Sequence, residues 1–356
     1  MTFVMAGGGT GGHVVPSIAV ARELVSAGHQ AVFVGTRSGA EAVLVPRAGF
    51  RIEWIEIGGL QRVGLKKAAA TLWRLPFSIV RSARILSRHS AAAVFSMGGY
   101  AAAPVMLAAI ALRIPIVVME PNAAPGLVTR RLAGFVRKAL VSWPETAKWF
   151  PSDRVELTGL PVRNEFFQIP EKEPGDVLTV LITGGSRGAA ALNRAARECW
   201  PLIRERRLPV RLVLQCGPAQ HEELAAEFRR QEIDGDVVAF IEDMPGAYAA
   251  ADIVVSRAGA GAVAEIAAAG RAAILVPFPY ATDDHQRRNA EELAKLGGAR
   301  LLPERELSGE RLYQVLADLA RKPGELRAMA RSARRAARPG AAAVAARHLL
   351  EQAVKR

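Results

Sequence analysis

Short apolar runs rich in Val and Ile alternate along the chain with longer segments that have helical periodicity. Buried parallel strands joined by crossover helices produce this alternation, so the pattern predicts a doubly wound α/β fold. The alternation restarts halfway, which indicates two similar sheets. The strands expected in the first half are Thr2–Ala6, Ala31–Gly35, Arg51–Ile55, Ala93–Ser96, Ile116–Met119 and Lys138–Val141. Those expected in the second half are Leu178–Thr183, Arg211–Gln215, Val237–Phe240, Ile253–Ser256 and Ala273–Pro277.

A proline-rich segment separates the two halves. Residues 150–175 contain four prolines and no helical pattern, as expected of a linker, and we place the boundary near Arg163. A chain of 356 residues has room for two domains of roughly 150 to 200 residues each. We therefore expect an N-terminal domain over 1–162 and a C-terminal domain over 163–340. The last segment, 341–356, is expected to be a helix that packs back on the first domain or stands in solvent.

Charge and cysteine content narrow the class of protein. The 47 Lys and Arg against 34 Asp and Glu give a net charge of +13, which favours phosphates, nucleic acid or acidic lipid headgroups as partners. Only Cys199 and Cys216 are present, so neither a disulfide framework nor a zinc site is expected. The first residues lack an export pattern, and prolines and an arginine interrupt the longest apolar stretch, 101–119. We expect a soluble or peripheral protein of the cytosol.

A glycine-rich turn follows the first strand of each half. Gly7–His13 reads Gly-Gly-Gly-Thr-Gly-Gly-His and Gly184–Gly188 reads Gly-Gly-Ser-Arg-Gly, each before a predicted helix. Backbone N–H groups and a helix N-terminus converge in such turns, so both predict phosphate sites, although a plain tight turn has the same pattern. A dinucleotide site also needs an acid after the second strand, where Thr36, Arg37 and Ser38 stand instead. A dehydrogenase is therefore disfavoured.

Two further junctions carry polar side chains suited to a nucleotide sugar. Residues 256–265 lead from a strand into a helix and end in Glu265, whose carboxylate is able to accept both hydroxyls of a ribose. An acid favoured by the helix dipole is the plainer interpretation. Gln286 and Asn289, three residues apart on a predicted helix, place amides on one face, as recognition of sugar hydroxyls requires.

A long stretch of the first half contains no acid. Between Ile57 and Met119 there is no Asp or Glu, while Lys and Arg accumulate around a group of apolar side chains, Leu72, Trp73, Leu75, Phe77 and Ile79. Apolar side chains beside cations predict a patch that docks on an anionic membrane surface. A stripe that faces the core, with a solvated basic face opposite, gives the same pattern.

Several short motifs occur in a specific order along the chain. They are Gly7–His13, Met97–Tyr100, Glu120–Asn122, Pro125–Leu127, Gly159, Pro161–Arg163, Gly184–Ser186, Ser256–Arg257, Gly259–Glu265, Asp284–Gln286 and Asn289–Ala290. Taken together the set resembles the MurG family of bacterial N-acetylglucosaminyltransferases over essentially the whole chain. The resemblance implies two Rossmann-like domains facing across a cleft, the GT-B fold. It implies inverting transfer of N-acetylglucosamine from UDP-GlcNAc to the 4-hydroxyl of undecaprenyl-pyrophosphoryl-MurNAc-pentapeptide, on the cytoplasmic face of the bacterial inner membrane in peptidoglycan synthesis.

The resemblance also implies roles for individual residues. Contacts with UDP-GlcNAc are implied for Ser186 and Arg163 near the diphosphate, the backbone at Ile241 on uracil, Glu265 on ribose, and Gln286 and Asn289 on the sugar. Thr10, Gly11, Gly12 and Asn122 match further substrate-binding positions, and the first glycine turn then suits the diphosphate of the lipid acceptor. The chain departs from the family at Pro121, Leu160 and Arg187, where Gln, Asn and Gln are usual. Arg187 adds a cation near the donor diphosphate.

Inverting transfer needs a base for the acceptor hydroxyl and positive potential for the departing UDP. His13, at the end of the first glycine turn, is the first candidate for the base, with a structural role as its alternative, and Glu120 is the second. No metal or other cofactor is expected, because a helix N-terminus at Ser186 and the cation Arg163 supply the stabilisation. Residues 234–236 spell the Asp-x-Asp pattern of metal-dependent transferases, but Asp-Gly is interpreted first as a turn.

Other classes of protein stay open. A non-catalytic nucleic-acid binder agrees with the charge, but zinc-finger and RNP-type signatures are missing and aromatic residues are only 6% of the chain, so no nucleic-acid partner is expected. Among enzymes, a glycolipid glycosyltransferase or a UDP-sugar epimerase shares the two-domain plan.

Overall fold

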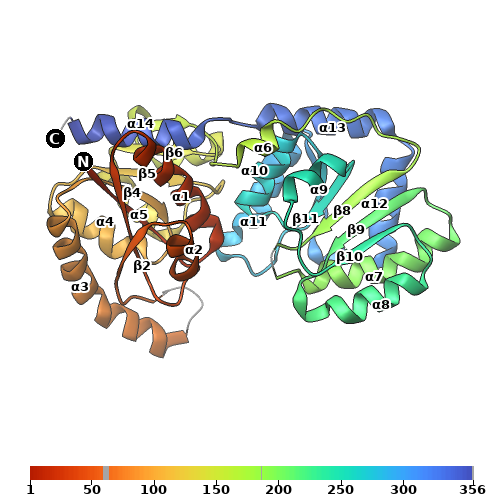
Figure 1. Cartoon of the computed structure of the whole chain (residues 1–356), viewed down its shortest axis with the longest axis horizontal. Helices are drawn as coiled ribbons and strands as arrows, with labels where there is room; N and C mark the ends of the chain where they lie inside the picture. Colours follow the sequence, from red (N-terminus) through yellow and green to blue (C-terminus); the bar gives the residue numbers. More distant parts are fainter. Residues whose placement is uncertain (59–63, 186, 355–356) are drawn as a thin grey trace. The chain divides into compact units, whose positions relative to one another are not determined.

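The computed structural model describes residues 1–58, 64–185 and 187–354, and within 64–72 it describes the side chain of Thr71 alone. The chain divides into two compact units (Figure 1). The first comprises Met1–Pro161 together with Gly340–Arg356, and the second comprises Val162–Pro339. Each unit is built on its own parallel sheet with helices packed against it, which confirms the predicted α/β class with two sheets.

A seven-stranded sheet forms the centre of the first unit, in the order β3-β2-β1-β4-β5-β6-β7, and its strand pairs are parallel. The strands are β1 Thr2–Gly7, β2 Gln30–Gly35, β3 Arg51–Trp54, β4 Ala91–Gly98, β5 Ile116–Glu120, β6 Lys138–Val141 and β7 Val155–Leu157. The helices are α1 Gly11–Ser26, α2 Glu41–Arg47, α3 Gly64–Arg88, α4 Ala102–Ala111, α5 Leu127–Leu132 and α14 Ala341–Val354, with 3-10 turns at Ala133–Phe135, Pro144–Trp149 and Ser152–Arg154. The last helix, α14, contacts α1, β4 and β5, so the end of the chain belongs to this unit.

A six-stranded parallel sheet forms the centre of the second unit, in the order β10-β9-β8-β11-β12-β13. The strands are β8 Leu178–Thr183, β9 Val210–Gln215, β10 Gly235–Val238, β11 Ile253–Ser256, β12 Ala272–Leu275 and β13 Ala299–Leu301. The helices are α6 Asn164–Phe167, α7 Ala190–Glu205, α8 His221–Arg230, α9 Met244–Ala250, α10 Ala260–Ala269, α11 His285–Lys295, α12 Gly309–Ala320 and α13 Pro323–Ala336, with 3-10 turns at Pro218–Gln220, Thr282–Asp284 and Glu304–Glu306.

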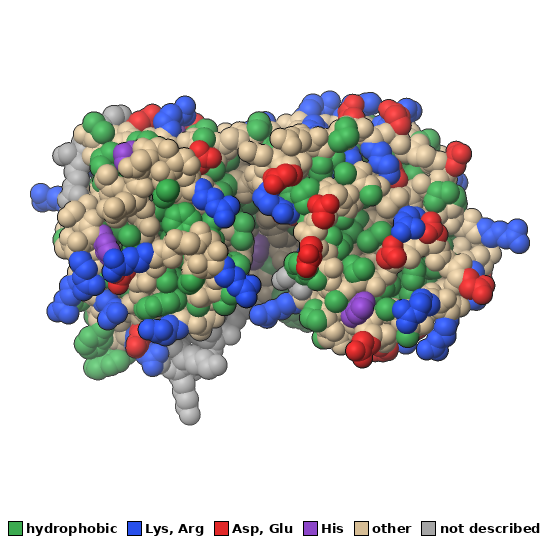
Figure 2. Space-filling model, in the orientation of Figure 1, with side chains coloured by type: hydrophobic (Ala, Val, Ile, Leu, Met, Phe, Trp, Pro, Cys, Tyr) green, Lys and Arg blue, Asp and Glu red, His purple; other side chains and the backbone are tan. Residues whose placement is uncertain are grey.

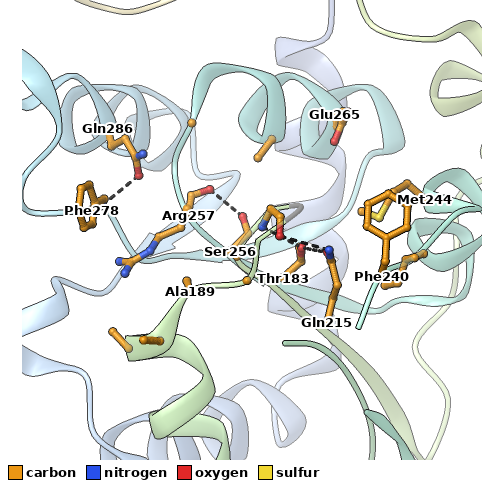
Figure 3. A pocket seen from close by; sticks show the side chains of 18 of the residues that line it. Thr183, Ala189, Gln215, Phe240, Met244, Ser256, Arg257, Glu265, Phe278 and Gln286 are labelled. Atoms are coloured by element: carbon orange, nitrogen blue, oxygen red, sulfur yellow. Dashed lines mark hydrogen bonds between the residues drawn. The ribbon is translucent and has the colours of Figure 1, made fainter. Parts of the chain in front are cut away.

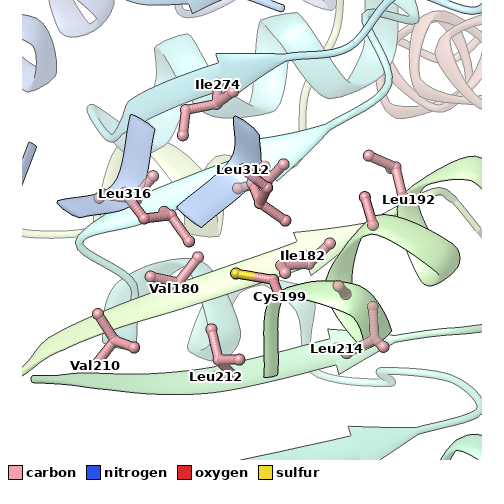
Figure 4. Close-up of a cluster of buried hydrophobic side chains, with 14 of the residues drawn as sticks. Val180, Ile182, Leu192, Cys199, Val210, Leu212, Leu214, Ile274, Leu312 and Leu316 are labelled. Carbon is pink, nitrogen blue, oxygen red and sulfur yellow. The ribbon is translucent and has the colours of Figure 1, made fainter. Parts of the chain in front are cut away.

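The core of the second unit shows why these segments form a sheet with helices against it (Figure 4). Alternate side chains of β8 and β9 meet the apolar faces of α7 and α12, and burial of each such side chain stabilises the fold by roughly 1.5 to 3 kcal/mol. The residues that meet there include Val180, Ile182, Leu192, Cys199, Leu212, Leu214, Leu312 and Leu316.

Sequence patterns missed two strands and displaced a third. β7 and β13 are three-residue strands at sheet edges, Val-Glu-Leu and Ala-Arg-Leu, and a charged residue in the middle prevents either from appearing as an apolar run. The predicted strand Val237–Phe240 begins and ends two residues earlier, at Gly235–Val238. Its expected last residue, Phe240, leaves the sheet and is 56% exposed.

Both glycine turns emerge where the strand order reverses. β1 lies between β2 and β4, and β8 lies between β9 and β11. Because the strands are parallel, their carboxyl ends meet at one edge of each sheet. Open α/β sheets bind ligands at this edge, at the point of reversal, so the topology singles out the loops after β1 and β8.

Candidate functional site

A pocket of about 720 Å³ opens at the carboxyl edge of the second sheet (Figure 3). The glycine turn after β8 forms one wall, and the segments around α9, α10 and the start of α11 contribute the others. Its lining includes Gly184, Gly185, Gly188, Phe240, Ile241, Met244, Tyr248, Arg257, Glu265, Phe278, Gln286 and Glu304. Backbone amides, two carboxylates, two carboxamides and a guanidinium therefore converge on an otherwise apolar pocket, the usual composition of a polar-ligand site.

Two buried side chains fix the glycine turn of this pocket. The Gly185 N–H donates to Thr183 Oγ1 over 3.3 Å, Thr183 Oγ1 donates to Gln215 Oε1 over 2.6 Å, and Gln215 Nε2 donates to the Gly185 carbonyl over 3.2 Å. Gly188 has a φ of 71°, and a β-carbon there would collide with the backbone that follows β9. Gly185 and Gly188 are therefore held in place. Ser186, which the resemblance places near the donor diphosphate, lies outside the described residues.

Glu265 on α10 borders the pocket and forms no hydrogen bond with another described residue. Burial raises the pKa of its carboxyl from 4.5 to about 7, and the charge of Arg163 acts in the opposite direction. Tyr248 on α9 is fully buried, and its hydroxyl also lacks a partner among the described residues. Burial and then the charge of Glu265 raise the pKa of Tyr248. Unsatisfied polar groups beside a pocket are groups that the hydroxyls of a ligand can satisfy.

The opposite end of the pocket holds a fixed cation and an amide. Arg257 is paired with Glu304 over 2.5 Å, and its Nη1 donates to the Val276 carbonyl over 3.2 Å. Its guanidinium carbon lies 5.4 Å from the ring centroid of Phe278. Gln286 Oε1 accepts from the Phe278 N–H over 3.0 Å, so its Nε2 is the atom that can donate to a ligand.

Two residues that the sequence assigns to the donor do not line this pocket. Asn289 has 0% exposure, and its Nδ2 donates to the Ala258 carbonyl over 3.2 Å, so it holds the loop that precedes α10. Arg163 precedes α6, and its guanidinium carbon lies 5.1 Å from the ring centroid of Phe166. Arg163 affects the site through its positive charge, which lowers the pKa of Glu265. Of Gln286 and Asn289, therefore, only Gln286 lines the pocket, and Asn289 lies in the core.

The Asp-x-Asp sequence of the second unit is part of a strand pairing. Arg211 in β9 donates to Asp234 and, over 2.6 Å, to Asp236. Gly235 between them has a φ of 140° and pairs with Leu212, where a β-carbon would collide with the neighbouring strand. The three charged side chains are 41 to 58% exposed, so their pairing contributes little stability. Asp234, Gly235 and Asp236 therefore serve the pairing of β10 with β9.

In the first unit the glycine turn after β1 leads through Thr10, Gly11 and Gly12 into α1. The His13 N–H donates to the Thr10 carbonyl over 3.1 Å, and His13 Nδ1 lies 3.3 Å from both the Gly8 carbonyl and Thr10 Oγ1. A carbonyl can only accept, so the contact with Gly8 places the proton of the neutral ring on Nδ1 and makes Nε2 the basic nitrogen. A β-carbon at Gly11 would meet nothing within 4 Å, so the outer side of the turn is open.

Glu120 ends β5 at the same edge of the first sheet. β4 separates β5 from β1, so the ends of the two strands are roughly 10 Å apart. Glu120 is 3% exposed, and its Oε1 accepts from the Asn122 N–H over 3.1 Å and from Asn122 Nδ2 over 3.2 Å. Burial raises the pKa of Glu120 from 4.5 to about 7, against the hydrogen bonds from Asn122 and Gly126 and the charge of Arg130. Glu120 and Asn122 thus form a hydrogen-bonded pair.

Only part of the apolar group from which a membrane patch is predicted is exposed on α3. Trp73 and Phe77 are 76% and 67% exposed, with ring centroids 6.4 Å apart. Leu75 and Ile79 pack instead against the core of the first unit, because residues two apart on a helix point to different sides. The side chain of Leu72 lies outside the described residues. Four arginines, namely Arg74, Arg81, Arg84 and Arg88, lie on the same helix, and basic side chains are seen on the surface near α3 (Figure 2). Among the described residues no helix is both long and apolar enough to cross a membrane.

Sequence reasoning missed several residues that shape these sites. Thr183 and Gln215 are polar residues that close apolar strands, and this position is the signal that marks them. Tyr248 and Glu304 have no local signal, because one belongs to an apolar helix and the other to an ordinary charged turn. A fifth residue, Glu41, is the first residue of α2.

Comparison with known proteins assigns both halves of the chain to one family. Residues 3–141 match the glycosyltransferase family 28 N-terminal domain, and residues 179–345 match the family 28 C-terminal domain. The chain is 54% identical over 352 residues to the UDP-N-acetylglucosamine–N-acetylmuramyl-(pentapeptide) pyrophosphoryl-undecaprenol N-acetylglucosamine transferase of Solibacter usitatus, covering 99% of this chain and 96% of that protein. It is 39% identical over 351 residues to the transferase of the same name from Geobacter metallireducens, with 97% and 96% covered.

Solved structures agree with this assignment. The crystal structure of Acinetobacter baumannii MurG matches with a TM-score of 0.84 at 32% identity, covering 98% of this chain and 99% of that one. The resemblance deduced from the ordered motifs is thereby confirmed. The chain belongs to glycosyltransferase family 28, and within it to the MurG family of UDP-N-acetylglucosamine–N-acetylmuramyl-(pentapeptide) pyrophosphoryl-undecaprenol N-acetylglucosamine transferases.

Proposed function

We propose that this glycosyltransferase moves N-acetylglucosamine from UDP-GlcNAc to the 4-hydroxyl of undecaprenyl-pyrophosphoryl-MurNAc-pentapeptide, a step of peptidoglycan synthesis. The observation that carries the proposal is the near-complete match to transferases whose name states these two substrates. The pocket of the second unit supports it, because a volume of about 720 Å³ suits a nucleotide sugar.

In this proposal the second unit binds the donor. The ribose hydroxyls bond to Glu265, uracil lies along the backbone at Ile241, and Gln286 Nε2 donates to the sugar. The glycine turn with Ser186 receives the diphosphate, and the charges of Arg163 and Arg257 favour it. Asn289 contributes indirectly, because it holds the loop that leads into α10.

In the first unit the proposed base is His13. Its Nε2 takes the proton of the acceptor 4-hydroxyl as the oxygen attacks the anomeric carbon from the side opposite UDP, so the configuration inverts. The proton moves to the imidazole, the glycosidic bond to phosphate breaks, and UDP leaves with the electron pair. Glu120, bonded to Asn122, is assigned the role of positioning that amide against the acceptor, and Thr10, Gly11 and Gly12 provide backbone contacts.

Two variants test the assignment of the base. We expect His13→Ala to lower kcat by roughly 10² to 10⁴, as loss of a general base does. Glu120→Gln keeps the size and one acceptor oxygen, so it should raise the KM for the acceptor more than it lowers kcat. The measurement is transfer from labelled UDP-GlcNAc to the lipid-linked acceptor. Near-normal turnover by H13A together with a collapse of kcat in E120Q would reverse the two roles.

The same assay separates the other classes of function. Wild-type chain should give labelled disaccharide product and free UDP. Epimerised UDP-sugar without transfer would favour an epimerase, a product on a different glycolipid would favour another transferase, and oligonucleotide binding without any UDP binding would favour a nucleic-acid binder.

We also propose that the first unit associates peripherally with the anionic cytoplasmic face of the inner membrane. Trp73 and Phe77 lie next to each other in the exposed surface of α3 among arginines, so the rings can enter the headgroup boundary while the guanidinium groups meet lipid phosphate. A lipid-linked acceptor also requires an enzyme that works at this surface.

Vesicle sedimentation tests this association. The chain should pellet with anionic vesicles at low salt and be released by salt, because screened charges lose their attraction. Replacing Trp73 and Phe77 by Ser should weaken pelleting at least tenfold. Phe135→Ser is the matched control, since Phe135 is 59% exposed in the same unit but lies outside α3. Equal loss in the control, or none in the double variant, would contradict the proposed patch.

A further inference from the structure

A buried carboxylate lies beneath the glycine turn of the first unit. Glu41 is the first residue of α2, it is 1% exposed, and within the described ranges no cation pairs with it. A carboxylate removed from water in this way is costly unless hydrogen bonds replace the lost hydration. The partners of Glu41 therefore indicate what it is there to hold.

The groups that donate hydrogen bonds to Glu41 belong to two loops at the carboxyl edge of the sheet. The Gly9 N–H donates to Oε2 over 2.8 Å. The Thr36 N–H and Thr36 Oγ1 donate to Oε1 over 2.9 and 2.8 Å. Each carboxylate oxygen thus serves a different loop, and Glu41 joins the turn after β1 to the chain that follows β2.

The surrounding glycines make room for this side chain. A β-carbon at Gly8, Gly35 or Gly39 would come within 3.0 Å of Glu41 atoms. Gly8 is part of the glycine turn, so one reason for its lack of a side chain is the carboxylate of this protein itself. The Glu41 side chain therefore fills the space beneath the turn.

A tyrosine holds the turn from another side. Tyr100, which follows β4, places its hydroxyl 3.3 Å from Thr36 Oγ1. A β-carbon at Gly9 would come 3.0 Å from its ring, and Gly9 has a φ of 94° that favours glycine. Glu41, Thr36 and Tyr100 thus enclose Gly9 on the inner side, while His13 Nδ1 contacts the Gly8 carbonyl.

We propose that Glu41 is a positioning residue for glycosyl transfer, which fixes the first glycine turn so that His13 stands where the acceptor hydroxyl needs its base. The inference rests on the proposed function. It also has a consequence for the acceptor. Because Glu41 occupies the Gly9 N–H, the acceptor diphosphate has to be held by other groups of the turn, such as the open backbone at Gly11 and Gly12.

The test compares Glu41→Gln with the wild-type chain. A carboxamide has one accepting oxygen, so it can serve Gly9 or Thr36 but not both, while the volume stays the same. Misplacement of a catalytic group by about 1 Å costs up to about 10²-fold in rate, so we expect kcat to fall roughly 10- to 100-fold. The dissociation constant of UDP-GlcNAc should stay within about twofold, since that ligand binds the second unit. Amide exchange of a peptide spanning residues 6–13 should accelerate.

Two further variants separate positioning from a loss of stability. Glu156→Gln is the control, because Glu156 is also a hydrogen-bonded carboxylate of the first unit, held by His348 and remote from the turn in sequence. It should lower the melting temperature without changing kcat. In the double variant H13A/E41Q, kcat should be no lower than in H13A alone, because Glu41 acts through His13.

The outcomes distinguish the inference from the function on which it rests. No transfer by the wild-type chain would overturn both. Transfer by the wild-type chain with normal kcat in E41Q, with additive losses in the double variant, or with an equal kcat loss in E156Q, would overturn the role of Glu41 and leave the proposed function standing.

Discussion

The raised pKa of Glu265 predicts that UDP-GlcNAc binds more tightly as pH rises. A ribose offers two donating hydroxyls, so the ionised carboxylate is the form that binds it best. With a pKa of about 7, only about one tenth of the free protein carries this form at pH 6 and about nine tenths at pH 8. The dissociation constant of UDP-GlcNAc should therefore fall up to about tenfold between these pH values. Glu265→Gln should abolish the dependence and bind weakly throughout.

Titration calorimetry with UDP-GlcNAc measures this effect. The intact nucleotide sugar is preferable to UDP, whose terminal phosphate itself gains a charge in this range. His285 is next to Gln286 in the chain. The matched control is therefore His285→Asn, which should keep the pH dependence. A flat profile in the wild type, or an unchanged slope in E265Q, would refute the assignment of Glu265 to the ribose.

The same shift has a consequence for stability. The folded state holds the proton of Glu265 more tightly than the unfolded state, so stability falls as pH rises from 4.5 towards 7 and stays lower above it. The shift corresponds to at most about 3 to 4 kcal/mol, reduced by water in the pocket. E265Q should remove this loss, and thermal melts at pH 5 and 8 would show it. A wild-type chain that gains stability over this range would contradict the origin assigned to the shift.

Three other substitutions test particular contacts. Tyr248→Phe removes a buried hydroxyl without a described partner, so it should raise the free energy of unfolding by about 1 kcal/mol; a drop of several degrees in melting temperature would show that the hydroxyl is bonded. Gln215→Leu leaves the Thr183 hydroxyl without an acceptor for its proton and the Gly185 carbonyl without the Gln215 donor, so calorimetry should show UDP-GlcNAc affinity falling about tenfold, and unchanged affinity would exclude this support. Burial alone would raise the pKa of Glu156, but hydrogen bonds from Lys138 and His348 outweigh it and lower the pKa. Glu156 should stabilise α14 fully above pH 4.5, and this stabilisation should be lost as pH falls through the folded pKa. At neutral pH, E156Q should lower the free energy of unfolding by about 1 kcal/mol. Unchanged amide exchange in α14 would contradict this.

Helical spacing explains where the prediction of the site succeeded and where it stopped. Trp73 and Leu75 look alike in the sequence, but Trp73 is exposed while Leu75 is partly buried against the core. The elements that α3 packs against, α4 and β4, decide which side of the helix is covered. Gln286 and Asn289 were predicted to share a face. Asn289 is instead buried and donates to the Ala258 carbonyl in the loop before α10, while Gln286 remains at the pocket.

The sequence by itself determined most strands of both sheets, the two glycine turns and the family, while the edge strands β7 and β13 were missed. These are local properties, because an apolar run of four to six residues and a turn that needs glycine are encoded by neighbouring residues. Only the tertiary structure decided the partners that come from far along the chain. Gly9 meets a carboxylate 32 residues away, Thr183 meets an amide 32 residues away, and Glu156 meets His348 across 192 residues. Burial, which follows from the packed fold, also set the pKa values of Glu120 and Glu265, since the free energy of a charge depends on how much water surrounds it.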